Sequence, residues 1–194
     1  MNMSNLINDP ELDRIGDTRN VVDQYRGKTV DSIKDDMSNN AFPLHIAIEN
    51  IQHDFNIGSI VRSANAFNVA GVHIIGKRHW NRRGAMSTEK YLQLFHHPDI
   101  NSFMDWVLDN KLTIVGIDNV EGSVNLGVYV FPEDAVLVFG QEGPGLSKDM
   151  QKCCKSLVAI EQYGSTRSVN VGVAAGIVMH EWVRRLKQDI KQIS

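Results

Sequence analysis

Five short apolar runs along the chain predict the strands of a β-sheet. They span residues 44–48, 72–75, 112–117, 135–139 and 157–160. Valine and isoleucine are frequent in these runs, and polar residues do not alternate with them. Such strands are typical of a parallel sheet that is buried on both faces, and the roughly 20 to 35 residues between them leave room for crossover helices. The pattern therefore predicts an α/β fold with a mostly parallel sheet flanked by helices.

Helical periodicity appears between these runs and near the end of the chain. Apolar residues recur every three or four positions in 57–67, in 100–108 and in 171–186. Gly172 and Gly176 leave the backbone of the last helix almost bare, so another segment is expected to approach it closely. Arg184, Arg185 and Lys187 stand where the C-terminus of a helix favours cations.

The first 42 residues have a different pattern. Residues 1–17 are polar and acidic and are expected to be mobile. Two short helical patterns follow between Thr18 and Met37, separated by Gly27, with Thr18 and Thr29 as candidate N-caps. We predict a short helical N-terminal arm in residues 1–42, packed on a main domain in residues 43–194.

Three polar clusters follow predicted strands. They cover residues 50–67, 139–147 and 163–170. Ligands bind outside the carboxyl ends of the strands in an open parallel sheet, so the three clusters are expected to meet there. In the first cluster, Asn56 is a suitable N-cap for the helix that follows, and Arg62 projects from its polar side. An arginine in this position is more often solvated or paired with a carboxylate than functional.

The second cluster is rich in glycine. Gly140, Gly143 and Gly145 follow a predicted buried strand, as if the backbone must clear a ligand. The spacing fits neither the Walker pattern nor the dinucleotide fingerprint, and the cluster lies on a late strand. This disfavours an NAD- or ATP-dependent enzyme and the common order of Rossmann-type methyltransferases.

A basic segment follows the second predicted strand. Lys77, Arg78, Arg82 and Arg83 lie within seven residues, together with Trp80. This composition fits phosphate contacts and base stacking on RNA. A solvated basic loop with Trp80 turned inward explains it equally well.

Composition narrows the remaining classes of function. The net charge of −3 gives no overall attraction to nucleic acid, so RNA binding requires a local basic patch. The chain shows no secretory signal and no long apolar run, which predicts a cytoplasmic protein without a membrane partner. Cys153 and Cys154 are adjacent and are expected to be packing residues, and the histidines form no metal-binding pattern, so no metal is expected.

Together the three clusters resemble the motifs of the SPOUT superfamily, in its SpoU/TrmH family of RNA ribose 2′-O-methyltransferases. The matching segments are residues 56–63, 138–147 and 160–171, the last followed by an alanine-rich helix. The resemblance extends from about Pro43 to Leu186. It implies a deep trefoil knot in the C-terminal part, S-adenosylmethionine as cofactor, and a homodimer.

The resemblance also implies roles for individual residues. The cofactor is expected against Ile117, Asp118, Gly140, Gly145, Ile160 and Val169. The expected catalytic residues are Arg62, Glu142, Ser168 and Asn170, with Arg62 reaching across the dimer interface. The expected RNA contacts are Asn56, Arg62, Lys77, Arg78, Arg82 and Arg83.

The reaction implied is attack of a ribose 2′-hydroxyl on the methyl group of the cofactor. Removing a proton from a guanidinium at neutral pH costs about 7 kcal/mol. We therefore expect Arg62 to hold an RNA phosphate, while Glu142 or the phosphate accepts the proton. The short arm contains no separate RNA-binding domain, which favours tRNA over rRNA. The competing hypothesis is a non-catalytic RNA-binding or assembly protein that retains the fold.

Overall fold

The computed structural model describes residues 6–50, 56–141 and 143–193, and the side chains of these residues as far as Gln188. Its centre is a seven-stranded sheet in which all pairs are parallel. The strands are β1 (Phe42–Asn50), β2 (Val69–Gly76), β3 (Leu94–His97), β4 (Thr113–Ile117), β5 (Val124–Asn125), β6 (Ala135–Phe139) and β7 (Ser156–Ala159). Their order in the sheet is β3-β2-β1-β6-β4-β7-β5. The α/β fold and all five predicted strands are confirmed.

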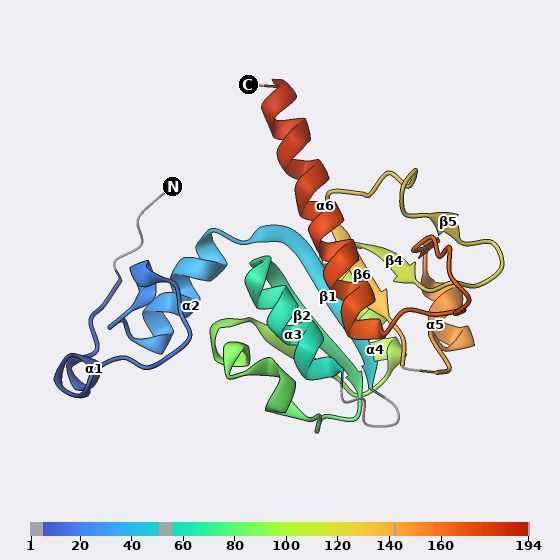
Figure 1. Cartoon of the computed structure of the whole chain (residues 1–194). Helices are drawn as coiled ribbons and strands as arrows, with labels where there is room; N and C mark the ends of the chain where they lie inside the picture. The colour runs from blue at the N-terminus through green and yellow to red at the C-terminus, as the bar shows by residue number, and fades with distance from the viewer. Residues whose placement is uncertain (1–5, 51–55, 142, 194) are drawn as a thin grey trace.

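Helices cover both faces of the sheet. The long helix α6 (Val171–Ile193) lies beside α3 (Ile57–Ala66) on one face (Figure 1). Side chains from both helices pack with Leu44, Ile46 and Ile48 of β1 in the larger core cluster. The opposite face carries α4 (Ile100–Asp109) and α5 (Lys148–Cys153), which pack against Ala47 and other strand residues. Burial on both faces explains why the strands read as continuous apolar runs.

The residues before the sheet contain α1 (Pro10–Ile15), a 3₁₀ turn η1 (Asp23–Tyr25) and α2 (Val30–Asn39). Thr29 is the N-cap of α2, as predicted, because its hydroxyl accepts a hydrogen bond from the Ser32 N–H. The prediction that Thr18 caps a helix is wrong, since the only helical turn that follows before α2 is η1. Instead Asp9 caps α1, where Pro10 stands at the first helical position.

The arrangement of α2 links this part to the sheet domain. Ile33 and Met37 pack with Tyr91 of the 3₁₀ turn η3 (Thr88–Tyr91), and Tyr25 donates a 2.6 Å hydrogen bond to Asp36. The pKa of Tyr25 is raised to about 12, mainly because the side chain is buried and also because it lies beside the Asp36 carboxylate. The boundary at residue 42 stays a prediction.

Three histidines form a buried hydrogen-bonded chain on the face covered by α4. His73 lies 3.0 Å from His45 and 2.9 Å from His97, measured between ring nitrogens. Phe95 stacks on His73, and Trp106 lies with its ring centroid 4.2 Å away. Burial lowers the pKa of His45 to about 4 and that of His73 to about 2. Burial also lowers the pKa of His97, so all three histidines pack as neutral rings at neutral pH.

Candidate functional site

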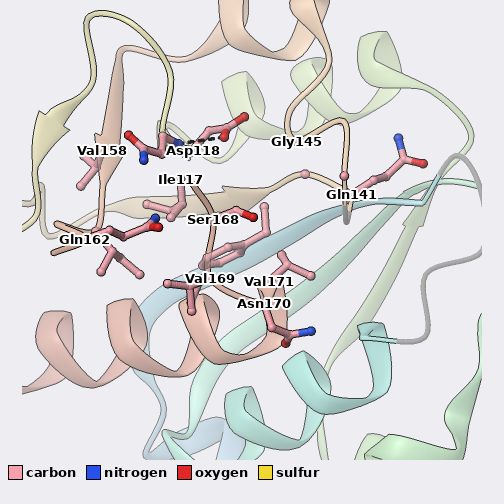
Figure 2. A pocket seen from close by; sticks show the side chains of 16 residues that line it. Ile117, Asp118, Gln141, Gly145, Val158, Gln162, Ser168, Val169, Asn170 and Val171 are labelled. Atoms are coloured by element: carbon pink, nitrogen blue, oxygen red, sulfur yellow. Dashed lines mark hydrogen bonds between the residues drawn. The ribbon is translucent and has the colours of Figure 1, made fainter. Parts of the chain in front are cut away.

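A cavity of about 290 Å³ lies at the carboxyl ends of three neighbouring strands (Figure 2). Ile117 of β4, Phe139 of β6 and Val158 of β7 form its apolar floor. The glycine-rich loop after β6, residues 140–147, borders one side, and the turn that leads into α6 borders another. The second and third polar clusters meet here, whereas none of the described residues of the first cluster lines the cavity.

All six residues predicted to contact a cofactor line this cavity. They are Ile117, Asp118, Gly140, Gly145, Ile160 and Val169. Ser168 and Asn170, two of the predicted catalytic residues, also line it. These eight residues therefore share one cavity, and their roles remain predictions.

The glycines of the loop are required because the loop folds back on itself. A Cβ atom at Gly140 would lie 2.1 Å from the carbonyl carbon of Gly145, and Gln141 and Gly145 exchange two backbone hydrogen bonds. Gly145 has a φ of +71°, and a Cβ there would lie 2.4 Å from Asp118 Oδ2. Gly140 and Gly145 are thus explained by the protein's own atoms, without the ligand that the sequence suggested, whereas a Cβ at Gly143 would meet nothing within 4 Å.

Two carboxylates from different strands anchor the end of this loop. Asp118, just after β4, accepts a 2.8 Å hydrogen bond from the Leu146 N–H. Glu49, near the end of β1, accepts bonds from the Ser147 N–H (2.8 Å) and hydroxyl (2.7 Å). Glu49 is only 1 % exposed. Sequence reasoning missed Glu49, although a carboxylate at the end of a buried strand is a signal that could have identified it.

The start of α6 is joined to the start of α3. Asn170 Oδ1 accepts hydrogen bonds from the N–H groups of Gly172 and Val173, and its Nδ2 donates to Asn56 Oδ1 at 3.0 Å. Asn56 is the N-cap residue of α3, as predicted, although its side chain makes no capping hydrogen bond. A Cβ at Gly172 would lie 3.3 Å from Ser59 Cβ, which confirms a close approach there. Gly176 has only ordinary contact with Ser63.

The remaining predicted catalytic residues lie outside this cavity or outside the described residues. Arg62 is exposed on α3 and does not line the cavity of the single chain. Glu142 falls outside the described residues. A single chain therefore brings Ser168 and Asn170, but not Arg62, to the cavity.

The basic segment lies beside the first turn of α3. The buried Asn50 donates hydrogen bonds from Nδ2 to the carbonyl oxygens of Lys77 (2.6 Å) and His79 (3.0 Å). A Cβ at Gly58 would lie 3.0 Å from the Asn81 carbonyl oxygen, so the segment packs directly on α3. The four basic residues, Lys77, Arg78, Arg82 and Arg83, are exposed.

Trp80 does not project from this segment as a free platform for a base. It is half-buried and packs against the larger core cluster, with the Arg82 guanidinium 5.7 Å from its ring centroid. Of the two interpretations of Trp80, the structure supports the inward-turned ring. The exposed cations remain available for phosphate contacts.

Arg185, in the middle of α6, binds the segment that follows β5. It donates hydrogen bonds to the carbonyl oxygens of Leu126 and Tyr129 and pairs with Glu181 at 2.7 Å. The helix continues to Ile193, so Arg184, Arg185 and Lys187 do not mark its end. Sequence reasoning missed this role because it assigned Arg185 to the helix terminus.

No helix in the part of the chain that the structure describes is long and apolar enough to cross a membrane. Within the same residues, no group of three or more His, Cys, Asp or Glu side chains is arranged to hold a metal ion. Cys153 and Cys154 are both free and half-buried, and they pack against the α4 face of the core.

Known proteins resemble this chain in sequence over most of its length. Residues 43–180 match the family described as the SpoU rRNA Methylase family. An uncharacterized tRNA/rRNA methyltransferase of Mycobacterium sp. (strain KMS) is 33% identical over 149 residues, which are 73% of this chain and 46% of that protein. The chain therefore spans about half the length of the curated relatives that it matches.

Solved structures show the same fold. The SpoU methyltransferase AviRb from Streptomyces viridochromogenes, in complex with the cofactor AdoMet, is 28% identical with a TM-score of 0.65. The match covers 73% of this chain and 57% of that one. The TrmH/SpoU tRNA modifying enzyme of A. aeolicus has a TM-score of 0.72 at 22% identity, covering 82% and 83% of the two chains, and shows the fold alone.

Proposed function

We propose that this chain, which belongs to the SpoU rRNA methylase family, transfers a methyl group from S-adenosylmethionine to a ribose 2′-hydroxyl of RNA. The observation that carries the proposal is the cavity at the ends of β4, β6 and β7, where the second and third motif segments meet. The relative from Mycobacterium sp. (strain KMS) is likewise described as a tRNA/rRNA methyltransferase.

The residues of the cavity fit this cofactor. Its volume of about 290 Å³ is near the lower end of small-molecule sites, and its floor is apolar while its rim is polar. The buried Oε1 of Gln162 at this cavity has no hydrogen-bond partner among the described residues, so a donor on a ligand can satisfy it. Bound there, the cofactor supplies an electrophilic methyl group on its sulfonium.

The protein's tasks are then to position a ribose and to remove one proton. Asn170, fixed by the N–H groups of α6 and by Asn56, and Ser168 stand at the cavity where a ribose can approach. Arg62 holds the RNA phosphate, because a charged guanidinium suits a phosphate better than it suits a base. Glu142 or the phosphate accepts the proton.

Arg62 reaches the cavity of a second copy of the chain in this proposal. It is exposed on α3, which packs against α6, and α6 exposes Val173 (54%) and Ile177 (40%). An apolar helical face of this kind is expected to be covered in a homodimer.

A complementation experiment tests this arrangement. Arg62→Ala and Gly140→Val chains are each expected to be inactive alone. In a refolded mixture, half of the dimers combine the two chains, and each of these contains one complete site, so about a quarter of the wild-type activity should return. No recovery would show that Arg62 acts within its own subunit.

We also propose that the C-terminal segment is knotted, as in SPOUT proteins. Asn119 Nδ2 donates to the Arg167 carbonyl oxygen at 3.3 Å, so residues near 119 contact the segment before α6. Arg185 of α6 holds Leu126 of the same stretch. These contacts of the stretch with the segment before α6 and with α6 itself support the proposal.

The substrate proposed is tRNA in preference to rRNA, in the cytoplasm. The four exposed cations beside α3 offer phosphate contacts next to the segment that bears Asn56 and Arg62. Purified protein should transfer label from methyl-labelled S-adenosylmethionine to tRNA, and digestion to nucleosides should yield a 2′-O-methylated product. RNA binding without transfer, unaffected by Arg62→Ala, would instead support a non-catalytic RNA-binding protein.

A further inference from the structure

Gln162 lines the cavity and has a side-chain oxygen without a hydrogen-bond partner among the described residues. It lies two positions beyond Ile160, which is predicted to contact the cofactor. Its side-chain oxygen Oε1 is buried and accepts no hydrogen bond from any described residue. Figure 2 shows the amide pointing into the cavity, on the side where Val158 and Ile117 lie. A buried carbonyl oxygen is costly to leave unpaired, so its orientation toward a cavity indicates a ligand that donates a hydrogen bond.

The surroundings of Gln162 select the part of the ligand that lies there. Val158 and Ile117 are buried and provide an apolar surface. A planar purine suits such a surface, whereas the ammonium and carboxylate of a methionine moiety are costly to bury in it. Polar groups, among them Ser168 and Asp118, stand elsewhere on the rim.

We propose that Gln162 recognises the adenine of the cofactor, an inference that rests on the proposed function. Its Oε1 accepts a hydrogen bond from the exocyclic N6 amine, and its Nε2 donates to ring nitrogen N7. A glutamine amide pairs with adenine in this two-bond manner because it presents an acceptor and a donor side by side. Gln162 is thus a specificity-determining residue for an adenine nucleoside over a 6-keto purine nucleoside.

Gln141 has a similar buried Oε1 without a partner, but it lies elsewhere in the cavity. It belongs to the glycine-rich loop, and Figure 2 shows it beyond Gly145, pointing away from Gln162. The two amides therefore do not share one group of the ligand.

Calorimetric titration with two ligands tests the proposal. The ligands are S-adenosylhomocysteine and S-inosylhomocysteine, in which a carbonyl replaces the N6 amine. Wild-type protein should bind the adenosyl ligand at least about tenfold more tightly, since a two-bond pair discriminates by that order. In Gln162→Met, the ratio of the two dissociation constants should fall by about tenfold, with Gln24→Met, on the exposed surface of η1, as the matched control.

A second variant keeps the test valid if the Gln162→Met protein does not fold. In Gln162→Leu, which lacks both the amide acceptor and the amide donor, discrimination should also fall. A ratio that stays within about twofold of wild type in a folded Gln162 variant would overturn the inference. Failure of the wild-type protein to bind S-adenosylhomocysteine at all would instead refute the proposed function.

Discussion

Replacing Glu49 by glutamine should loosen the glycine-rich loop and weaken cofactor binding. The buried Glu49 carboxylate accepts two hydrogen bonds from Ser147, at 2.8 Å from the backbone nitrogen and 2.7 Å from the hydroxyl. Ser147 is also the N-cap of α5 and closes the loop that borders the cavity. Glu49→Gln therefore weakens the connection between β1, the end of the glycine-rich loop and the start of α5.

The size of the effect follows from the number of acceptors. A hydrogen bond to a charged group contributes about 1.5–3 kcal/mol, and a glutamine amide keeps only one of the two acceptor oxygens. Its NH₂ group would face a donor of Ser147. We expect a loss of about 2–3 kcal/mol in the free energy of unfolding, which lowers the melting temperature of a chain of this length by roughly 5–10 °C.

Thermal unfolding and calorimetry with S-adenosylhomocysteine would measure both consequences of Glu49→Gln. Affinity should fall by about tenfold or more, because part of the binding energy must then order the loop. Glu11→Gln, at an exposed carboxylate of α1, is the matched control and should behave as wild type. A Glu49→Gln protein with unchanged melting temperature and affinity would refute this reasoning.

Three further perturbations have defined outcomes. Burial lowers the pKa of His45 to about 4 and of His73 to about 2, so below about pH 6.5 the unfolded state binds protons that the folded state does not. The free energy of unfolding should thus be fully retained above pH 6.5 and fall at lower pH by about 1.4 kcal/mol per unit for each histidine. In urea titrations, His73→Phe should reduce this slope and the exposed His180→Gln should not. Gly140→Ala should abolish binding of S-adenosylhomocysteine in calorimetry, since its Cβ would lie 2.1 Å from the Gly145 carbonyl carbon; binding at wild-type strength would contradict the loop geometry. Arg185→Met should lower the free energy of unfolding by about 2–4 kcal/mol because it releases two carbonyl groups, whereas Arg184→Met, which removes an exposed ion pair, should cost at most about 1 kcal/mol; equal losses would refute the role of Arg185.

The sheet could be predicted from sequence wherever burial shapes the composition. All five apolar runs lie in strands, because each strand is covered on both faces by helices. The two strands that sequence reasoning missed are at the edges: β5 has two exposed residues, and β3 has only His97 buried. Their pairing depends on neighbouring strands rather than on their own composition. By contrast, α1 carries a local signal in Asp9 and Pro10 that could have identified it.

The site was predictable as a meeting point of segments but not as a set of contacts. The ends of parallel strands lie at one edge of the sheet, which is why the glycine cluster and the residues before α6 could be placed together. Glu49 and Ser147 are 98 positions apart, and Arg185 and Leu126 are 59 apart. No periodicity or local propensity encodes contacts at such separations, which only the folded chain reveals.

In the proposed function, the cavity at the ends of β4, β6 and β7 holds the methyl donor. A crystal structure of the protein with S-adenosylhomocysteine tests this proposal. We expect the ligand in this cavity, with its adenine near Gln162 and its sulfur facing Ser168 and Asn170. A ligand bound elsewhere, with this cavity left empty, would contradict it.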